Sequence, residues 1–377
     1  MSKLKVMTVV GTRPEIIRMS RVIAKLDEYC DHVFVHTGQN YDFELKEVFF
    51  RDLEIRRPDY FLDAAGQTAM ETIGNILIKI EPILESTCPE AFLVLGDTNS
   101  CLAAIAAKRR HIPVFHMEAG NRCFDQRVPE EMNRKIVDHI SDINMPYSDI
   151  SREYLLREGI PPDKIIKTGS PMYEVLHHNL DRIAASMVLR DMNLSPGQYF
   201  IASIHREENV DSPAMMEKLV FVLNQLGELY NKRIIFSAHP RTRKRLRDLK
   251  VKFDPHVEIV NPFGFLDYVY LQMNAYAVLS DSGTITEESS ILNFPALNLR
   301  EAHERPEGME EGAVMMTGIN TDRILQGLRI IENQPKGQNR ILRNISDYGM
   351  PNVSEKIIMI IHSYVDYVRR TVWRESF

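Results

Sequence analysis

The sequence predicts an α/β fold with two Rossmann-like domains, each built on a parallel sheet. Short apolar runs of strand length alternate with segments of helical periodicity along the chain. Strands separated by helix-length connections imply parallel pairing through right-handed crossovers. The pattern stops near Gly169-Ser170-Pro171 and begins again at Tyr199, and 377 residues suit two domains better than one.

In the first half, a strand is expected at Lys5–Val10, followed by a helix from Pro14 to about Leu26. Pro14 suits the first turn of that helix, where its missing N–H is tolerated. The later elements of this half are strands at His32–Thr37, Ala91–Leu95, Pro113–His116, Asp142–Met145 and Ile165–Thr168, and helices at Glu71–Leu84 and Ser100–Arg110. Their lengths are those of ordinary strands and helices.

The second half repeats the alternation. Strands are expected at Tyr199–Ile204, Arg233–Ser237, Val257–Val260, Ala277–Leu279, Ala296–Leu299 and Ala313–Met316, with helices near 212–230, 241–249, 265–274, 284–292 and 321–332 between them. We therefore predict one domain of residues 1–169 and another of residues 170–354. Residues 355–377 contain a helix, Glu355–Arg370, that is expected to pack back on the first domain. Ligands would bind between the domains, at the carboxyl ends of both sets of strands.

Composition narrows the function classes. A net charge of -6 argues against non-specific nucleic-acid binding, and no apolar run is long enough to span a membrane. The four cysteines lack metal-site or disulfide-framework spacing, which is typical of a reducing compartment. With no signal-peptide pattern at the N-terminus, we expect a cytoplasmic protein.

The first strand ends in Gly11-Thr12-Arg13-Pro14-Glu15. Glycine between a strand and a helix allows close approach of a phosphate, and Arg13 could bind it. The second and third glycines of a nicotinamide fingerprint are missing. A capped, tightly turned connection fits the same residues equally well.

Charged clusters end other strands as well. Asp97, in Gly96-Asp97-Thr98, could cap the next helix or serve as a base. The stretch His116–Arg122, followed by Pro129–Arg134, places carboxylates and arginines after the Pro113–His116 strand. Carboxylates at this edge can move protons and arginines can hold phosphate, whereas in a solvated loop they would only form surface ion pairs.

In the second half, His205 follows a strand and could donate a proton, bind phosphate or be structural, and His239 repeats that arrangement. The segment Asp281–Glu288 opens a helix with a Ser-Gly-Thr turn. Its free backbone N–H groups predict an anion site, with Glu287 or Glu288 near enough for ribose hydroxyls. An N-cap with acidic residues complementing the helix dipole is the structural alternative. Arg305 follows a later strand and would face the same cleft.

Taken in order, the motifs G-T-R-P-E, G-D-T, M-E-A-G-x-R, P-E-E-x-N-R, H-R-E-E-N, H-P, S-D-S-G and E-R-P-E resemble those of the non-hydrolysing UDP-N-acetylglucosamine 2-epimerases, from about Val6 to Gly318. Each motif is weak alone, but the ordered set is specific. The resemblance implies a GT-B-like fold with an interdomain active-site cleft, a homodimer, a UDP-sugar substrate and no cofactor or metal. It implies elimination of UDP to a 2-acetamidoglycal and re-addition of UDP with the C2 proton returned to the other face.

The resemblance also implies roles for matching residues. The catalytic candidates are Asp97, Glu118, Glu130 and His205. The substrate-binding candidates are Arg13, Arg18, Tyr268, Ser282, Gly283, Glu288 and Arg305.

Several positions depart from the family pattern. Arg18 stands where many members have lysine, Thr284 replaces a glycine, and Gln39–Phe43 lacks the pattern of the allosteric UDP-sugar site of some members. The loop Asn121–Val128 is similar to the branch acting on UDP-2-acetamido-2,6-dideoxy-L-talose, which makes UDP-N-acetyl-L-fucosamine for capsule or O-antigen. Phe124 could contact the 6-methyl group or pack into the core.

The sequence thus favours that 6-deoxy substrate over UDP-N-acetylglucosamine. A GT-B glycosyltransferase using a UDP-sugar is the alternative enzyme class, and a catalytically idle UDP-sugar sensor is the third possibility.

Overall fold

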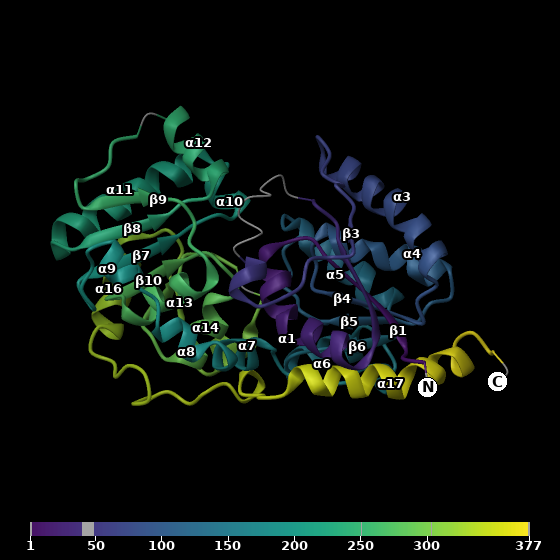
Figure 1. Ribbon diagram of the computed structural model, residues 1–377. Coiled ribbons are helices and arrows are strands. Elements are labelled where there is room, and N and C mark those ends of the chain that lie inside the picture. Colours follow the sequence, from purple (N-terminus) through teal and green to yellow (C-terminus); the bar gives the residue numbers. More distant parts are fainter. Residues whose placement is uncertain (1, 40–48, 250, 303, 376–377) are drawn as a thin grey trace. The chain divides into compact units, whose positions relative to one another are not determined.

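The chain folds into two compact α/β units. The computed structural model describes residues 2–39, 49–249, 251–302 and 304–375. Unit 1 comprises residues 1–178 and 346–377, and unit 2 comprises residues 179–345. Each contains a six-stranded parallel sheet, so the predicted α/β class with two parallel sheets is confirmed (Figure 1).

The sheet of unit 1 has the order β3-β2-β1-β4-β5-β6. Its strands are β1 (Lys5–Val10), β2 (Asp31–His36), β3 (Tyr60–Phe61), β4 (Ala91–Leu95), β5 (Val114–Met117) and β6 (Ile143–Met145). The helices of this unit are α1 (Arg13–Tyr29), α3 (Ala69–Thr87), α4 (Ala104–Arg109), α5 (Pro129–Ile140), α6 (Asp149–Arg157), α7 (Met172–His178) and α17 (Val353–Thr371), with 3-10 turns η1 (Asn99–Ala103), η2 (Pro162–Lys164) and η3 (Ser346–Tyr348). The central strands are buried on both faces, which explains their continuous apolar runs.

The sheet of unit 2 has the order β12-β11-β10-β7-β8-β9. Its strands are β7 (Tyr199–Ser203), β8 (Arg233–Ser237), β9 (Val257–Val260), β10 (Ala277–Ser280), β11 (Ala296–Asn298) and β12 (Met315–Met316). Its helices are α8 (Leu180–Ala184), α9 (Val188–Asp191), α10 (Glu207–Val210), α11 (Pro213–Tyr230), α12 (Pro240–Asp248), α13 (Phe265–Asn274), α14 (Ile285–Leu292), α15 (Pro306–Glu310) and α16 (Thr321–Ile331). In both sheets, parallel pairing brings the carboxyl ends of the strands to one edge.

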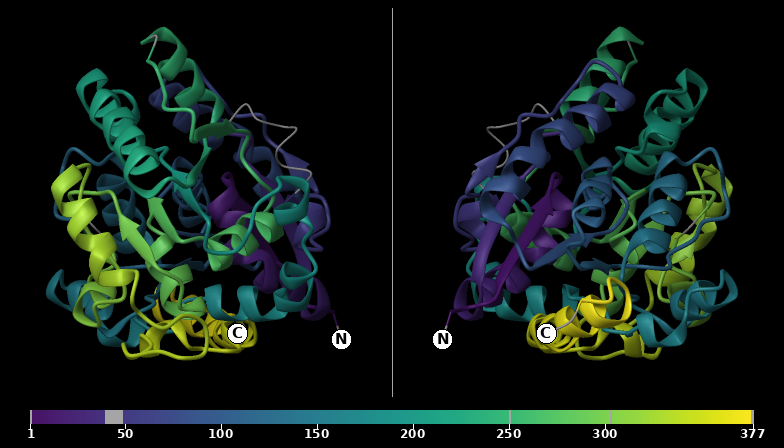
Figure 2. Two further views of the ribbon diagram at one scale, coloured as in Figure 1. Left: turned by 90° about the vertical axis from the view of Figure 1, so that its left-hand side faces the viewer. Right: turned by 90° about the vertical axis from the view of Figure 1, so that its right-hand side faces the viewer.

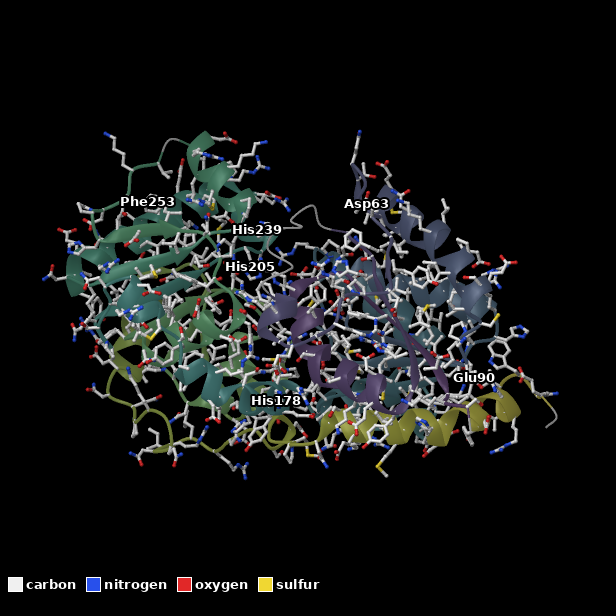
Figure 3. The ribbon with its side chains drawn as sticks, in the orientation of Figure 1. Asp63, Glu90, His178, His205, His239 and Phe253 are labelled. Atoms are coloured by element: carbon white, nitrogen blue, oxygen red, sulfur yellow. The ribbon has the colours of Figure 1, made fainter. Side chains whose placement is uncertain are left out.

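The C-terminal helix α17 packs against α1 of unit 1, as predicted. Its apolar face includes Ile357, Ile361 and Val365, all buried. Figure 2 looks along this helix from both ends. Near the end of α17, Arg369 Nη1 lies 3.9 Å from Oε1 of Glu90, a residue labelled in Figure 3. Two segments far apart in the sequence therefore form one core.

The predicted domain boundaries differ from the observed units, which divide at 178/179 and 345/346. Helix α7 packs against α1, and Glu174 accepts a hydrogen bond from the backbone N–H of Ser354 (2.9 Å). The backbone N–H of Ser170 donates to the carbonyl of Asp347 (2.9 Å). These contacts hold residues 170–178 and 346–354 in unit 1.

The predicted strand at Ile165–Thr168 is wrong. This segment runs beside β6, because the backbone N–H groups of Ile166 and Thr168 donate to the carbonyls of Asn144 (2.9 Å) and Pro146 (3.0 Å). It forms a single isolated bridge between Ile165 and Asn144. Within the part of the chain that the structure describes, no helix is both long and apolar enough to cross a bilayer.

Candidate active site

The turn after β1 is closely packed. A Cβ atom at Gly11 would lie 2.0 Å from Ser100 Oγ and 2.3 Å from Thr37 Oγ1, so only glycine fits. Thr12 and Glu15 form a capping box at the start of α1. Arg13 is half-buried, with its guanidinium 5.6 Å from the centre of the Phe49 ring. The capped-turn interpretation is confirmed, while a phosphate contact by Arg13 stays a prediction.

Glu15 is a buried carboxyl group that links two strand-end loops. It accepts hydrogen bonds from the backbone N–H groups of Gly11 (2.9 Å) and Thr12 (2.7 Å) and from the Thr98 hydroxyl (2.9 Å). Burial raises the pKa of Glu15 from its ordinary 4.5 to about 7, against the opposing effect of these donors. Sequence reasoning missed this residue, although it is the glutamate of the quoted G-T-R-P-E motif.

Asp97, directly after β4, forms an ion pair with Arg134 of α5. Arg134 Nε and Nη2 lie 3.0 and 2.5 Å from Asp97 Oδ2. The interpretation of Asp97 as a helix cap is wrong, because Thr98 is the N-cap of η1 and its hydroxyl accepts from the backbone N–H of Ser100. Asp97 is half-buried, and its side chain follows β4 at the carboxyl edge of the sheet.

Glu118, directly after β5, is buried and ion-paired with Arg18 of α1. Asn121 Nδ2 donates to its other carboxylate oxygen at 3.1 Å. The backbone of Glu118 has φ +62°, in the left-handed region that non-glycine residues rarely adopt. The structure thus brings together one predicted catalytic residue and one predicted substrate-binding residue in unit 1.

Glu130 and Glu131 begin α5 but differ in environment. The predicted residue, Glu130, is half-buried. Glu131 is fully buried and accepts hydrogen bonds from Arg134 Nη1 (2.8 Å) and the backbone N–H of Cys123 (3.1 Å). It therefore connects Arg134 to the start of the Cys123–Val128 loop. Sequence reasoning could not separate two adjacent glutamates of the same motif.

In unit 2, Asp281 fixes the loop after β7. Its carboxylate accepts hydrogen bonds from the backbone N–H groups of His205 (3.0 and 3.1 Å) and Arg206 (2.9 Å). His205 Nδ1 lies 3.3 Å from Asp281 Oδ1, and the His205 side chain is 45% exposed. His205 and His239 follow the neighbouring strands β7 and β8, and both are labelled in Figure 3. Asp281 thus holds the backbone of His205 in place, while the imidazole ring stays accessible to solvent.

The Ser282-Gly283-Thr284 turn precedes α14. Ser282 Oγ and Thr284 Oγ1 are 2.9 Å apart, and Thr284 makes no side-chain capping bond. A Cβ atom at Gly283 would lie 2.9 Å from Arg305 Nη1. The Arg305 guanidinium is therefore packed directly against this turn. The predicted Ser282, Gly283 and Arg305 meet in unit 2.

The two glutamates of α14 have different partners. Arg305 Nε lies 3.1 Å from Glu287 Oε2 in a buried ion pair. Glu288 accepts a hydrogen bond from Gln272 of α13 at 2.7 Å. Tyr268 is also on α13, and burial together with the charge of Glu288 raises the pKa of its phenol. The predicted Tyr268 and Glu288 are thus electrostatic neighbours.

Residues 40–43 of the Gln39–Phe43 segment fall outside the described residues. Phe124 is among the residues that the structure describes. It is 67% exposed and stacks edge-on with Tyr154 at 5.3 Å, so its expected alternative of packing into the core is wrong.

Comparisons with known proteins show which family this chain resembles. Residues 24–362 match the family model described as UDP-N-acetylglucosamine 2-epimerase. The structure of UDP-N-acetylglucosamine 2-epimerase from Rickettsia bellii is 50% identical, with a TM-score of 0.92, over 99% of this chain and all of that one. The Methanocaldococcus jannaschii UDP-GlcNAc 2-epimerase, solved in complex with UDP-GlcNAc and UDP, is 36% identical with a TM-score of 0.88, over 96% of this chain and all of that one.

A third relative is named for a different sugar. A UDP-2,3-diacetamido-2,3-dideoxy-D-glucuronate 2-epimerase from Pseudomonas aeruginosa is 33% identical over 86% of this chain and 92% of its own length. The structural matches confirm the GT-B-like fold predicted for this chain.

Proposed function

The chain belongs to the UDP-N-acetylglucosamine 2-epimerase family, whose members are isomerases, and we propose that it inverts C2 of a UDP-2-acetamido sugar. UDP is eliminated across C1–C2 to give a 2-acetamidoglycal. UDP then adds back, and C2 receives a proton from the opposite face. We further propose that the protein is cytoplasmic and acts as a homodimer.

The observation that carries this proposal is the set of carboxylates at the carboxyl edge of the unit 1 sheet. Asp97 and Glu118 follow neighbouring strands, and an arginine is bound to each. Removing a proton from one face of C2 and returning one to the other requires two proton-transferring groups. We propose that these groups are among Asp97, Glu118 and Glu130. Arg134 holds Asp97 in place, and Arg18 holds Glu118 while remaining a proposed substrate-binding residue.

UDP binding is assigned mainly to unit 2. The Ser282-Gly283 turn and Arg305 would bind the diphosphate, with Arg13 as a further cation. Glu288 would accept hydrogen bonds from the ribose hydroxyls, and Tyr268 would contact the uracil. His205 is the proposed donor to the leaving oxygen, because its ring is exposed while its backbone is fixed by Asp281. Several contacts to UDP would keep it in the site between elimination and re-addition.

The favoured substrate is UDP-2-acetamido-2,6-dideoxy-L-talose, giving UDP-N-acetyl-L-fucosamine for capsule or O-antigen. The exposed side chain of Phe124, six residues after Glu118, is free of the core, and we propose that it contacts the 6-methyl group, which an apolar side chain suits better than a hydroxymethyl. UDP-N-acetylglucosamine is the alternative substrate of the same family.

The test is incubation with each UDP-sugar in D2O without an acceptor, followed by NMR of the products. Deuterium at C2 with formation of the epimer is expected. Transfer of the sugar only when an acceptor is added would instead identify a GT-B glycosyltransferase. Binding of UDP with neither reaction would identify a UDP-sugar sensor.

A further inference from the structure

His116, at the third position of β5, is buried between two hydrogen-bond acceptors. Its side chain is 0% exposed. Nε2 lies 2.9 Å from the carbonyl oxygen of Gly96, and Nδ1 lies 2.9 Å from Asp138 Oδ1. A carbonyl oxygen only accepts, so Nε2 must carry a proton. A neutral ring would then turn the Nδ1 lone pair toward Asp138, which is favourable only if Asp138 itself carries a proton. Because Arg122 and the backbone N–H of Gly120 also bind the Asp138 carboxylate, the geometry favours an ionised Asp138 in ion-pair contact with a doubly protonated His116 ring.

Asp138, on α5, is equally buried and makes three further contacts with two atoms of the loop after β5. The backbone N–H of Gly120 lies 3.2 Å from each carboxylate oxygen, and Arg122 Nη1 lies 2.7 Å from Oδ2. Arg122 is in turn held by Glu158 through contacts of 2.8 and 2.5 Å. Two cations and two carboxylates therefore alternate in a chain that runs from His116 through Asp138 and Arg122 to Glu158. Pairing of this kind stabilises buried charges.

The electrostatics agree with this protonation state. Burial disfavours the charged imidazole, but the hydrogen bond and charge of Asp138 outweigh it and raise the pKa of His116. Burial also acts to raise the pKa of Asp138, and His116 and Arg122 reverse it to a net lowering. The other titratable groups facing this pair are Asp97 and Cys101, whose thiol pKa is raised by burial and by the nearby carboxylates.

The network joins the two loops that carry the proposed catalytic carboxylates. Gly96 directly precedes Asp97, and Gly120 lies two residues after Glu118. The left-handed backbone of Glu118 is unfavourable for a residue with a side chain and persists only if its surroundings hold it. The loop is packed closely against α6, since a Cβ at Gly120 would lie 2.4 Å from the Ser151 carbonyl oxygen.

We propose that His116 and Asp138 form a buried imidazolium–carboxylate pair that positions the Asp97 and Glu118 loops relative to each other. Both are positioning residues, because they act through the two loops and are assigned no contact with the reacting atoms. The effect on C2 chemistry rests on the proposed function, whereas the pair itself does not.

The first experiment compares Asp138→Asn with Asp142→Asn as a matched control. Asp142 is also buried, accepts from a backbone N–H of β5 (Val114, 3.0 Å) and is ion-paired with Lys108, but it lies at the opposite end of that strand. In hydrogen–deuterium exchange, Asp138→Asn should speed exchange roughly tenfold at both residues 96–100 and 118–124. Asp142→Asn should leave both segments unchanged. If Asp138→Asn speeds exchange in only one of the two segments, or if Asp142→Asn speeds it in both, the two loops are not coupled through Asp138.

The second experiment measures turnover of the same two variants. Asp138→Asn should lower kcat roughly 10- to 100-fold, because misplacing a catalytic group has effects of this size, while UDP affinity stays near that of the wild type. Asp142→Asn should keep kcat despite a comparable loss of thermal stability. Equal kcat for the two variants overturns the positioning role. Absence of epimerisation in the wild type would instead refute the proposed function and leave the exchange result standing.

The third experiment measures the wild-type protein and covers the case in which Asp138→Asn fails to fold. In ¹⁵N NMR of the wild type at pH 7.5, His116 should show two protonated ring nitrogens, although an ordinary histidine is mostly neutral there. A His116→Gln sample assigns the signal. A neutral His116 ring at that pH overturns the pair.

Discussion

The carboxyl edges of the two sheets carry charge in different ways. In unit 1, each of the carboxylates Asp97, Glu118 and Asp138 is paired with an arginine. In unit 2, Asp281 instead binds backbone N–H groups, and small residues form the turn against Arg305. Side-chain pairs hold carboxylates at fixed points, as proton transfer needs, whereas a fixed backbone turn beside an arginine suits an anion. This difference supports the proposed division, in which unit 1 supplies the proton-transferring carboxylates and unit 2 supplies most of the UDP-binding groups, although unit 2 also contains the carboxylate–arginine pair Glu287–Arg305.

The largest effect is expected from removing carboxylates in unit 1. Asp97→Asn, Glu118→Gln and Glu130→Gln keep side-chain shape, and each should slow C2 exchange in D2O roughly 10²-fold or more. UDP affinity, which we propose depends mainly on unit 2, should change little. A variant with wild-type exchange is not a proton-transferring residue, and a large loss of UDP affinity in all three would contradict the division of roles.

Arg305→Ala tests the nucleotide-binding side. Loss of one charge-assisted contact should weaken UDP affinity by roughly 1.5–3 kcal/mol in calorimetry. Because Arg305 is also buried against Glu287, the variant should lose stability as well.

The control for that stability loss is the double variant Arg305→Ala/Glu287→Gln, which removes the unpaired buried charge. It should recover part of the stability but not the UDP affinity. Recovery of both would make Arg305 structural, and unchanged affinity in Arg305→Ala would remove it from the site.

Substrate choice should give a smaller effect. A methyl-sized contact discriminates by roughly 1–3 kcal/mol, so the 6-deoxy-L-talo sugar should be preferred over UDP-N-acetylglucosamine in kcat/KM without excluding it. Phe124→Ala should narrow the difference, whereas Phe221→Ala, at an exposed phenylalanine of α11, should not. A clear preference of the wild type for UDP-N-acetylglucosamine would overturn the substrate while leaving the epimerase proposal intact.

A separate effect, on stability rather than on the reaction, concerns pH and Glu15. Its folded pKa of about 7 lies above its ordinary 4.5, so the unfolded chain releases this proton first as pH rises. The resulting stabilisation is complete below pH 4.5 and is lost between about 4.5 and 7, by at most roughly 1.4 kcal/mol per pH unit. Glu15→Gln should flatten this part of the stability curve in denaturant titrations. Glu71→Gln, at an exposed first-turn glutamate of α3, is the control. An unaltered slope in Glu15→Gln would mean that Glu15 does not titrate there.

Local sequence patterns were enough to predict most of the strands and helices and the edge of each sheet at which charged residues gather. Strands β1, β4, β8 and β9 and helix α13 have the bounds expected from local patterns, because buried parallel strands read as continuous apolar runs and amphipathic helices repeat every 3.6 residues. Charged residues directly after those strands had to gather at one edge of each sheet, since parallel strands end together.

Which charged side chains pair with one another depends on the tertiary structure. Arg18 and Glu118 are 100 residues apart, and the alternation of strands and helices does not say which side chains will touch. It also could not separate Glu130 from Glu131, or reveal that His116 lies between Gly96 and Asp138. Residues 170–178 joined unit 1 because α7 packs on α1, a long-range contact. Burial and pairing depend on groups distant in sequence, and they set the ionisation of Glu15, His116 and Asp138.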